Sequence, residues 1–277
     1  LVTDGSVSAY GSYATIFVLL SFIAILGDGG LSLVFTRIAA GMDSATEAGL
    51  LRRVLAIRLV TLVLAFGVVA SVVAFVPRYP NVVRLGVILG ALGIASQLIT
   101  QLTLGVFQKR LRMATPAVAE VAGRATTLLF ALLAASREGG ALSFVGAFVG
   151  GTLVTLVIQL AATRRFIRLG AAEPRRIGAP APEAASPTPL PDMRSLLSEA
   201  WPLALLLLCS FVVFRADSLL LSLLRPPQDL GWYALPYKVL ESLLFFPAMI
   251  GGLLFPVLSR SLTTARDREQ VLVPLMA

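Results

Sequence analysis

The sequence predicts an all-α membrane protein whose chain crosses the bilayer about seven times. Hydrophobic residues make up 57% of the 277 residues, more than in ordinary soluble domains, and the mean hydropathy is +0.88. The apolar residues form long segments, each near or above the roughly 20 residues that a helix needs to cross a bilayer. Lys and Arg gather in alternate gaps between these segments. Because the period-2 alternation of a membrane barrel is absent, helices are the expected spanning elements.

Five apolar segments precede the one long linker of the chain. They cover residues 12–36, 54–76, 85–107, 116–135 and 141–161. The first segment opens beside Tyr10 and Tyr13, which suit the membrane interface, and it closes near Arg37, which suits the inner boundary. The next four segments are separated by short gaps, which predicts helices that run up and down beside their neighbours.

Two further segments, residues 198–224 and 231–258, follow the linker. The last segment and the first both open with Gly-x-Tyr-Ala and close near an Arg. This likeness suggests an internal repeat, which is common in secondary transporters. The alternative is that any two spans of the same direction share interfacial aromatic residues and an inner Arg.

Positive charge alternates from gap to gap. The gaps after the first, third and fifth segments and the tail after the seventh hold 16 Lys and Arg residues, with Arg58 counted among them, whereas the other three gaps hold 4. Excess Lys and Arg marks cytoplasmic loops. The alternation therefore predicts that residues 1–11 lie outside and that residues 164–197 lie in the cytoplasm.

The linker predicts two lobes. Residues 164–197 are basic and then rich in Ala and Pro, so they cannot bury enough apolar surface to fold. They are expected to separate a first lobe, residues 1–163, from the start of a second, residues 198–277, and to favour the anionic lipids of the inner leaflet. Because the chain begins with Leu1 and shows no signal peptide, although its first residues are expected outside, we interpret it as an internal fragment of a longer transporter-like protein.

Composition excludes several classes of site. There is no His, the commonest proton-transfer side chain and metal ligand. The single Cys, Cys209, lies in an apolar segment, where packing is its usual role. P-loop, dinucleotide and nucleophile–His motifs are missing, so we expect no cofactor, no metal and no enzymatic activity. The net charge of +8 is explained by the cytoplasmic loops, and nucleic-acid binding is not expected.

Charged residues inside the segments are candidate functional residues, because they are costly in a membrane unless paired or wetted. Arg215 and Asp217 in one segment, and Lys238 and Glu241 in the next, are expected roughly 10–15 Å below the outer surface, at 1.5 Å per residue. Two interpretations stay open. The four groups either form a polar cavity, in which cations hold an anionic head group and carboxylates couple a cation or proton, or a structural network of ion pairs.

Two more charged positions fall within segments. Glu120 and Arg124, four residues apart, are expected either at the inner mouth of a cavity or as a pair on the helix surface. Asp28 lies in the Gly-Asp-Gly-Gly stretch that starts at Gly27. That stretch predicts either a local helix break that exposes polar backbone to a cavity, or close packing between helices.

Motifs near the ends of the segments resemble a known family. They are Gly11-x-Tyr13, Gly27-x-Gly29-Gly30-Leu31, Trp201-Pro202-Leu203, Arg215-x-Asp217-Ser218, Gly231-x-Tyr233-Ala234 and Phe255-Pro256-x-Leu258-Ser259-Arg260. These stretches look like the second, seventh and eighth helices of bacterial oligosaccharide flippases of the Wzx type, in the multidrug/oligosaccharidyl-lipid/polysaccharide (MOP) superfamily. The resemblance implies two six-helix lobes around a cavity that alternates access in the bacterial inner membrane, with this chain covering helices two to eight.

The resemblance also implies a substrate and the residues that meet it. Family cavities are lined by cations that face the diphosphate of a polyprenyl-linked sugar. Arg124, Arg215 and Lys238 match that role by position, and Asp28, Asp217 and Glu241 are candidates for coupling a proton or sodium ion. The expected function is the transfer of a lipid-linked oligosaccharide to the outer leaflet for surface polysaccharide or lipopolysaccharide assembly. Membrane lipids and other polysaccharide-assembly membrane proteins are the expected partners.

Three alternatives to this function remain open. A multidrug exporter of the same superfamily would favour a more acidic and aromatic cavity, and a peptidoglycan-precursor flippase would differ in substrate. A membrane polysaccharide polymerase or ligase belongs to another class. It would need a large outer loop or a His-rich site, and the sequence shows neither.

Overall fold

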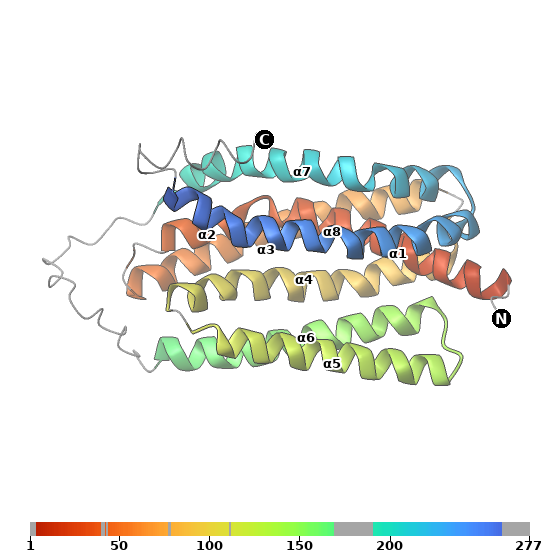
Figure 1. The fold of residues 1–277 in the computed structure, drawn as a ribbon, viewed down its shortest axis with the longest axis horizontal. Coiled ribbons are helices and arrows are strands. Elements are labelled where there is room, and N and C mark those ends of the chain that lie inside the picture. The colour runs from red at the N-terminus through yellow and green to blue at the C-terminus, as the bar shows by residue number, and fades with distance from the viewer. Residues whose placement is uncertain are drawn as a thin grey trace, which may run out of the picture. The chain divides into compact units, whose positions relative to one another are not determined.

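The computed structural model describes the backbone of residues 4–39, 42, 44–76, 79–110, 112–168 and 191–261, and the side chains of most of them. Within these ranges the chain forms eight helices and no strand, which confirms the all-α prediction (Figure 1). The helices are α1 (Asp4–Asp28), α2 (Leu31–Ala39), α3 (Ser44–Phe75), α4 (Asn81–Lys109), α5 (Ala114–Ser136), α6 (Ala141–Arg168), α7 (Met193–Leu224) and α8 (Pro227–Ser261). Most of the predicted linker lies outside the described residues.

Six helical stretches are long and apolar enough to cross a membrane, among the residues that were described. They are Ser8–Ala39, Thr46–Phe75, Asn81–Lys109, Ala114–Ser136, Ala141–Arg164 and Met193–Leu224. They correspond in order to the first six predicted segments, so the chain is a multi-pass membrane protein. The seventh predicted segment falls within α8, many of whose side chains lie outside the described residues.

The third helix begins earlier than the apolar segment it contains, and this corrects one sequence prediction. α3 starts at Ser44, and Glu47 in its first turn suits the positive end of the helix dipole. The basic residues that follow are compatible with a helix and continue it into the apolar stretch. The charge alternation assigns Arg58 to the loop cations, but it lies inside α3 and its side chain is fully buried.

The first predicted segment is broken where the Gly-Asp-Gly-Gly stretch lies. α1 ends at Asp28 and α2 starts at Leu31, because Gly29 and Gly30 adopt φ angles of +49° and +74°. Only Gly enters this region without steric strain. A Cβ atom on Gly30 would also lie 2.8 Å from the Cβ of Leu203 on α7. The helix break and the close packing therefore both occur, and exposure of the polar backbone to a cavity stays a prediction.

The helices group into two compact units, Leu1–Gly231 and Trp232–Ala277, and each is described by itself. In the first unit α1 packs against α3, α4, α6 and α7, and α5 packs against α6. α2 contacts α3, α4 and α7. Figure 1 shows α5 and α6 side by side below α4. The division into lobes at the linker stays a prediction, and α7 is already in contact with helices that precede the linker.

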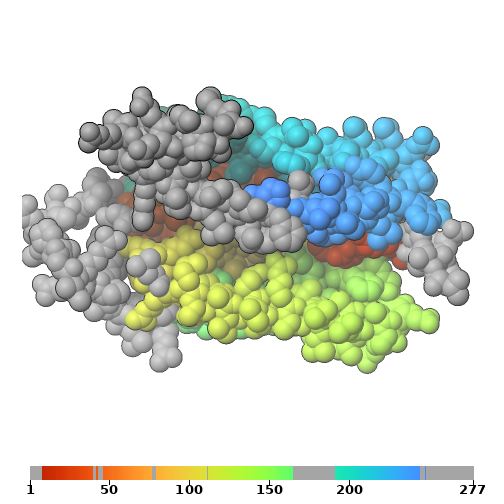
Figure 2. Space-filling view, viewed as in Figure 1, coloured from red at the N-terminus to blue at the C-terminus, as the bar shows by residue number. Residues whose placement is uncertain are grey.

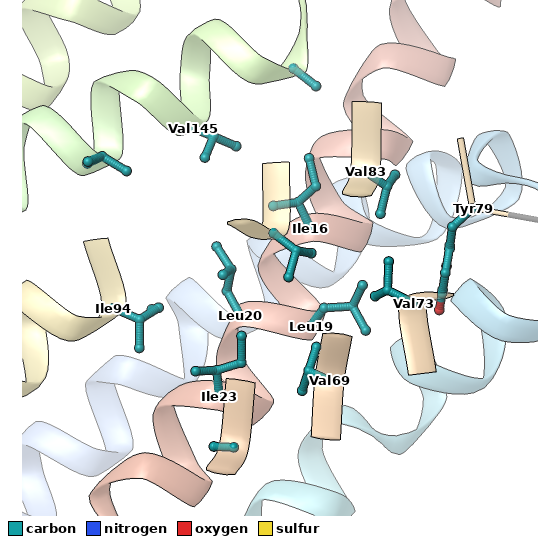
Figure 3. Close-up of a cluster of buried hydrophobic side chains, with 14 of the residues drawn as sticks. Ile16, Leu19, Leu20, Ile23, Val69, Val73, Tyr79, Val83, Ile94 and Val145 are labelled. Atoms are coloured by element: carbon teal, nitrogen blue, oxygen red, sulfur yellow. The ribbon is translucent and has the colours of Figure 1, made fainter. Parts of the chain in front are cut away.

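The core of the first unit has α1 at its centre. Ile16, Leu20 and Ile23 of α1 are fully buried, against apolar side chains of α3, α4 and α6 (Figure 3). Ile16 and Leu20 lie where a Cβ on Gly86 or Gly90 of α4 would overlap them. Small residues let helices approach closely in a membrane, where packing rather than the hydrophobic effect drives association.

Contacts at one end of the first unit join the predicted cytoplasmic gaps. Glu47, at the start of α3, forms ion pairs with Lys109 and Arg110, at the end of α4. Arg37, at the end of α2, forms an ion pair with Glu199, near the start of α7. All five residues come from gaps or helix ends on the side that the charge alternation predicts to be cytoplasmic.

The opposite end of the first unit is joined by a buried hydrogen bond. Tyr79, between α3 and α4, and Ser222, near the end of α7, lie with their hydroxyl oxygens 3.2 Å apart. Burial raises the pKa of the Tyr79 phenol above its ordinary value of 10.0, so this group stays protonated over the physiological range.

Large apolar side chains cover much of the outer surface. Val63, Leu128 and Val213, for example, are more than half exposed. A soluble monomer rarely exposes so many, whereas a bilayer accommodates them.

Figure 2 shows the later part of α4 and the beginning of α5, both in yellow, together on the visible face of the molecule.

Candidate functional site

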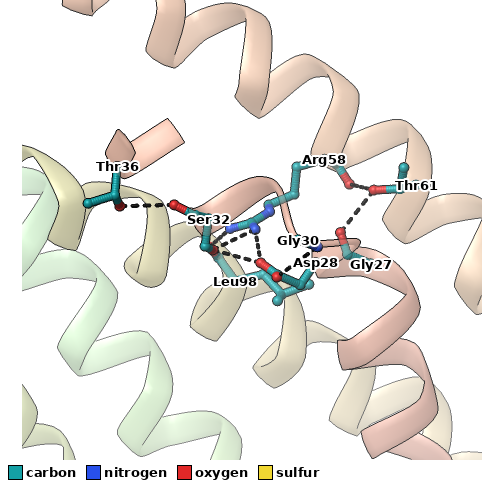
Figure 4. A network of polar contacts seen from close by, with 8 residues as sticks. All are labelled: Gly27, Asp28, Gly30, Ser32, Thr36, Arg58, Thr61 and Leu98. Atoms are coloured by element: carbon teal, nitrogen blue, oxygen red, sulfur yellow. Dashed lines mark hydrogen bonds and ion pairs between the residues drawn. The ribbon is translucent and has the colours of Figure 1, made fainter. Parts of the chain in front are cut away.

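A buried ion pair lies at the break between α1 and α2. The guanidinium of Arg58 on α3 pairs with Asp28 Oδ1, and its Nη2 atom also donates to Ser32 Oγ at 2.8 Å (Figure 4). Its other terminal nitrogen donates to the carbonyl oxygen of Leu98 on α4. One arginine therefore ties α3 to α1, α2 and α4 at once.

The carboxylate of Asp28 is held on several sides. Ser32 Oγ donates to Asp28 Oδ1 at 2.6 Å, and the backbone nitrogen of Gly30 donates to Asp28 Oδ2 at 3.2 Å. The second contact is possible because Gly29 and Gly30 turn the chain back toward the carboxylate. Nearby, Thr61 Oγ1 of α3 donates to the carbonyl oxygen of Gly27 at 2.9 Å. The break thus provides the polar partners that a buried charge requires.

Sequence reasoning identified Asp28 but missed Arg58. The signal was present, because Arg58 lies within the predicted segment 54–76. It was assigned to the loop because Arg52 and Arg53 lie just before it. The side chain of Arg58 is 1% exposed and that of Asp28 is 15% exposed, so the carboxylate is the more accessible partner.

A polar hollow of about 220 Å³ lies between α4, α5 and α6, and we call it the arginine hollow. Its lining includes Arg124 and Glu120 of α5, together with amide and hydroxyl side chains of all three helices. Those neutral polar side chains are Gln97, Thr100, Gln101, Thr127, Thr152 and Thr155. This is an unusual density of polar groups for helices that are otherwise apolar.

Glycines fix the position of Arg124. A Cβ on Gly123 would lie 2.7 Å from the carbonyl oxygen of Gly151, so α5 and α6 touch through their backbones at this point. Arg124 is the next residue along α5. Its Nε donates to Glu120 Oε1 at 2.8 Å, the pair on the helix surface that one of the two sequence interpretations expects. The Arg124 side chain is nevertheless 73% exposed, so most of the guanidinium is available to a ligand.

A second hollow, of about 380 Å³, lies between α1, α4, α6 and α7, and we call it the aspartate hollow. It is lined by Asp28 and by three aromatic rings, Phe17, Phe148 and Phe211. Gln97, Gln101 and Phe148 line both hollows. The structure thus brings two predicted site residues, Asp28 and Arg124, to neighbouring hollows with a shared wall.

The other four predicted residues lie on α7 and α8. Arg215 and Asp217 are partly buried on α7, and Asp217 Oδ1 accepts a hydrogen bond from the backbone nitrogen of Ser218 at 2.6 Å. Lys238 Nζ and Glu241 Oε2 of α8 are 3.1 Å apart, as expected for residues on one helix face. That these four charges lie at one depth in the membrane stays a prediction, because Lys238 and Glu241 belong to the second compact unit.

Among the described residues, no three His, Cys, Asp or Glu side chains are grouped as a metal ion requires. The two hollows offer a cation, carboxylates and neutral hydrogen-bonding groups. Such a set can bind and release a polar ligand.

Comparison with known proteins identifies the family. Residues 6–262, nearly the whole chain, match the family described as polysaccharide biosynthesis protein. No curated protein and no solved structure matches the chain significantly. The chain belongs to the polysaccharide biosynthesis protein family, the family of Wzx-type polysaccharide flippases of the MOP superfamily, whose members are membrane transporters rather than enzymes.

Proposed function

We propose that this protein moves a polyprenyl-diphosphate-linked oligosaccharide from the inner to the outer leaflet of the bacterial inner membrane, by alternating access. The lipid tail of such a substrate stays in the hydrocarbon, whereas its diphosphate and sugars need a polar path. Partners in this role are membrane lipids and other membrane proteins of polysaccharide assembly.

The arginine hollow supports this proposal most directly. Arg124 is a largely exposed cation in a hollow lined by Glu120 and by uncharged polar side chains, within a segment long enough to cross the membrane. An arginine fork suits phosphate oxygens, since its N–H groups can donate to two of them together. In this proposal Arg124 binds the diphosphate, and Glu120 holds the guanidinium in place before the substrate arrives.

Arg215 and Lys238 are proposed as further cations for the diphosphate, and Asp28, Asp217 and Glu241 as candidates for coupling a proton or sodium ion. For Asp28 the structure suggests how coupling would work. Its carboxylate already neutralises Arg58. A cation or proton bound there would have to compete with that guanidinium, which links occupancy of the site to the contacts between α1, α2 and α3.

A multidrug exporter is the second candidate, and one observation favours it. The aspartate hollow combines a carboxylate with three aromatic rings, and such a lining suits an apolar organic cation. Both candidates use alternating access, but they differ in the sign of the charge that the substrate carries.

Complementation tests the proposal. The full-length gene is placed in a strain that lacks its own O-unit flippase, and surface polysaccharide is measured. We expect the wild-type protein to restore polysaccharide and Arg124→Ala to lower it at least tenfold. The matched control is Arg137→Ala, which removes an exposed arginine just beyond the other end of α5.

The outcomes separate the two candidates. Failure of the wild-type gene in several such hosts, together with drug efflux, would favour the exporter and exclude the flippase. If Arg124→Ala restores surface polysaccharide to the wild-type level, Arg124 is not part of the substrate site. Arg215→Ala and Lys238→Ala, tested alongside, decide whether these two cations belong to it.

A further inference from the structure

Two glutamines on α4 stand out from the other polar side chains of the spanning helices. Gln97 and Gln101 are four residues apart and so lie on one face of α4, about 6 Å apart along the helix axis. Both line the arginine hollow and both line the aspartate hollow. Across the part of the chain that the structure describes, neither side-chain amide makes a hydrogen bond to another protein group.

Neighbouring polar groups are satisfied. Thr100 Oγ1 donates to the carbonyl oxygen of Ser96 at 2.8 Å, and Ser96 Oγ donates to that of Leu92 at 2.9 Å. Gln159 of α6, which is buried, accepts a hydrogen bond from Thr103 Oγ1 at 2.8 Å. These neighbouring side chains are therefore paired within the protein, whereas Gln97 and Gln101 are not.

An amide without a partner is unfavourable in a hydrocarbon environment. Gln97 and Gln101 are therefore expected to meet water or a ligand in the hollows that they line. Each amide offers two N–H donors and one carbonyl acceptor and carries no charge. This set matches hydroxyl groups, which both donate and accept, and it lacks the positive charge with which Arg and Lys bind phosphate groups.

The ring of Phe148 adds an apolar surface to the same wall. It lines both hollows beside the glutamines and is held by an edge-on contact with Phe17, with ring centroids 5.1 Å apart. A sugar ring presents hydroxyls at its edge and C–H groups on its faces. Amides beside an aromatic ring complement both parts.

We propose that Gln97, Gln101 and Phe148 form a subsite for the uncharged sugar of the transported lipid, distinct from the cation that meets the diphosphate. This subsite rests on the proposed function. Arg124 lines only the arginine hollow, and Asp28 lines only the aspartate hollow. The glutamines, on the shared wall, would contact the sugar next to the diphosphate.

Binding of two defined probes tests the subsite. The probes are undecaprenyl diphosphate that carries one N-acetylglucosamine and bare undecaprenyl diphosphate, and the protein is the purified full-length form. We expect wild-type protein to bind the sugar-bearing probe more tightly. Gln97→Leu/Gln101→Leu should weaken binding of that probe about tenfold, equivalent to one or two neutral hydrogen bonds. Binding of the bare probe should not change.

The control is Gln108→Leu, an exposed glutamine on the same helix that lines neither hollow. It should leave both affinities unchanged, and the thermal unfolding midpoints of all variants should be compared. Equal binding of the two probes by wild-type protein would overturn the subsite while leaving the flippase proposal intact. If the double variant binds both probes more weakly by the same factor, the glutamines have a structural role. Failure of wild-type protein to bind either probe would instead overturn the proposed function.

Discussion

Replacing Asp28 with Asn should destabilise the protein, because it leaves the Arg58 guanidinium buried without a counter-charge. The Arg58 side chain is 1% exposed, so water cannot replace the lost carboxylate. The guanidinium would keep its hydrogen bonds to the Leu98 carbonyl and to Ser32. The substitution preserves the size of the side chain, so packing should change little.

The expected loss follows from the burial of the pair. Removing one partner of a buried ion pair costs about 3–5 kcal/mol, and the lower end applies here because two acceptors remain. A loss of about 3 kcal/mol corresponds to a fall of about 6–12 °C in the unfolding midpoint for a chain of this size. Asp28→Asn combined with Arg58→Met removes both charges, and it should recover about 2 kcal/mol of that loss.

Thermal unfolding of the purified protein in detergent, at one fixed scan rate, measures these differences. Glu120→Gln is the matched control, because its ion pair with Arg124 is exposed and should contribute less than about 1 kcal/mol. If Asp28→Asn is as stable as the wild type, or if the two substitutions are simply additive, the pair does not join α1 to α3 as described.

Three further predictions concern helix packing, the hydrogen bond of Tyr79 and the orientation in the membrane. Gly123→Val should lower the free energy of unfolding by about 1–3 kcal/mol, because the valine side chain would overlap the backbone of Gly151. It should also reduce transport by displacing α5. A variant as stable as the wild type would contradict the close contact between α5 and α6. Tyr79→Phe should cost about 1 kcal/mol at neutral pH. Because burial raises the pKa of Tyr79, the wild type should lose this stabilisation as the pH rises above 10.0 and through the raised value. The variant lacks this contribution, so its stability should fall less over the same pH range, and equal pH curves would refute the burial effect. In a background without the native cysteine, Arg137→Cys should react with a membrane-impermeant thiol reagent from outside intact cells and Arg112→Cys should not; equal labelling would overturn the predicted orientation.

Apolar length and apolar composition were sufficient to predict the first six spanning helices and their order along the chain. Both are properties of a whole segment, so one atypical residue does not change the prediction of a spanning helix. The helix break at Asp28 was also predictable, because adjacent glycines permit the positive φ angles that it uses.

Residues of the site that depend on tertiary contacts were harder to predict. Arg58 follows two loop-like arginines, and only the fold shows that it lies opposite Asp28. Gln97 and Gln101 carry no charge, so a search for charges in apolar segments passes over them. The hollows that make these residues significant are formed by α1, α5, α6 and α7 around α4, and no local pattern contains that arrangement.

Transfer of a lipid-linked sugar between leaflets tests the central claim most directly. The full-length protein is reconstituted in liposomes that contain fluorescent undecaprenyl diphosphate-N-acetylglucosamine, and the fraction that becomes accessible on the opposite leaflet is measured over time. The proposed function predicts protein-dependent transfer that falls at least tenfold in Arg124→Ala and stays normal in Arg137→Ala. The claim would be contradicted if the lipid-linked sugar crosses only at the protein-free rate while the same preparation exchanges an organic cation across the same membranes.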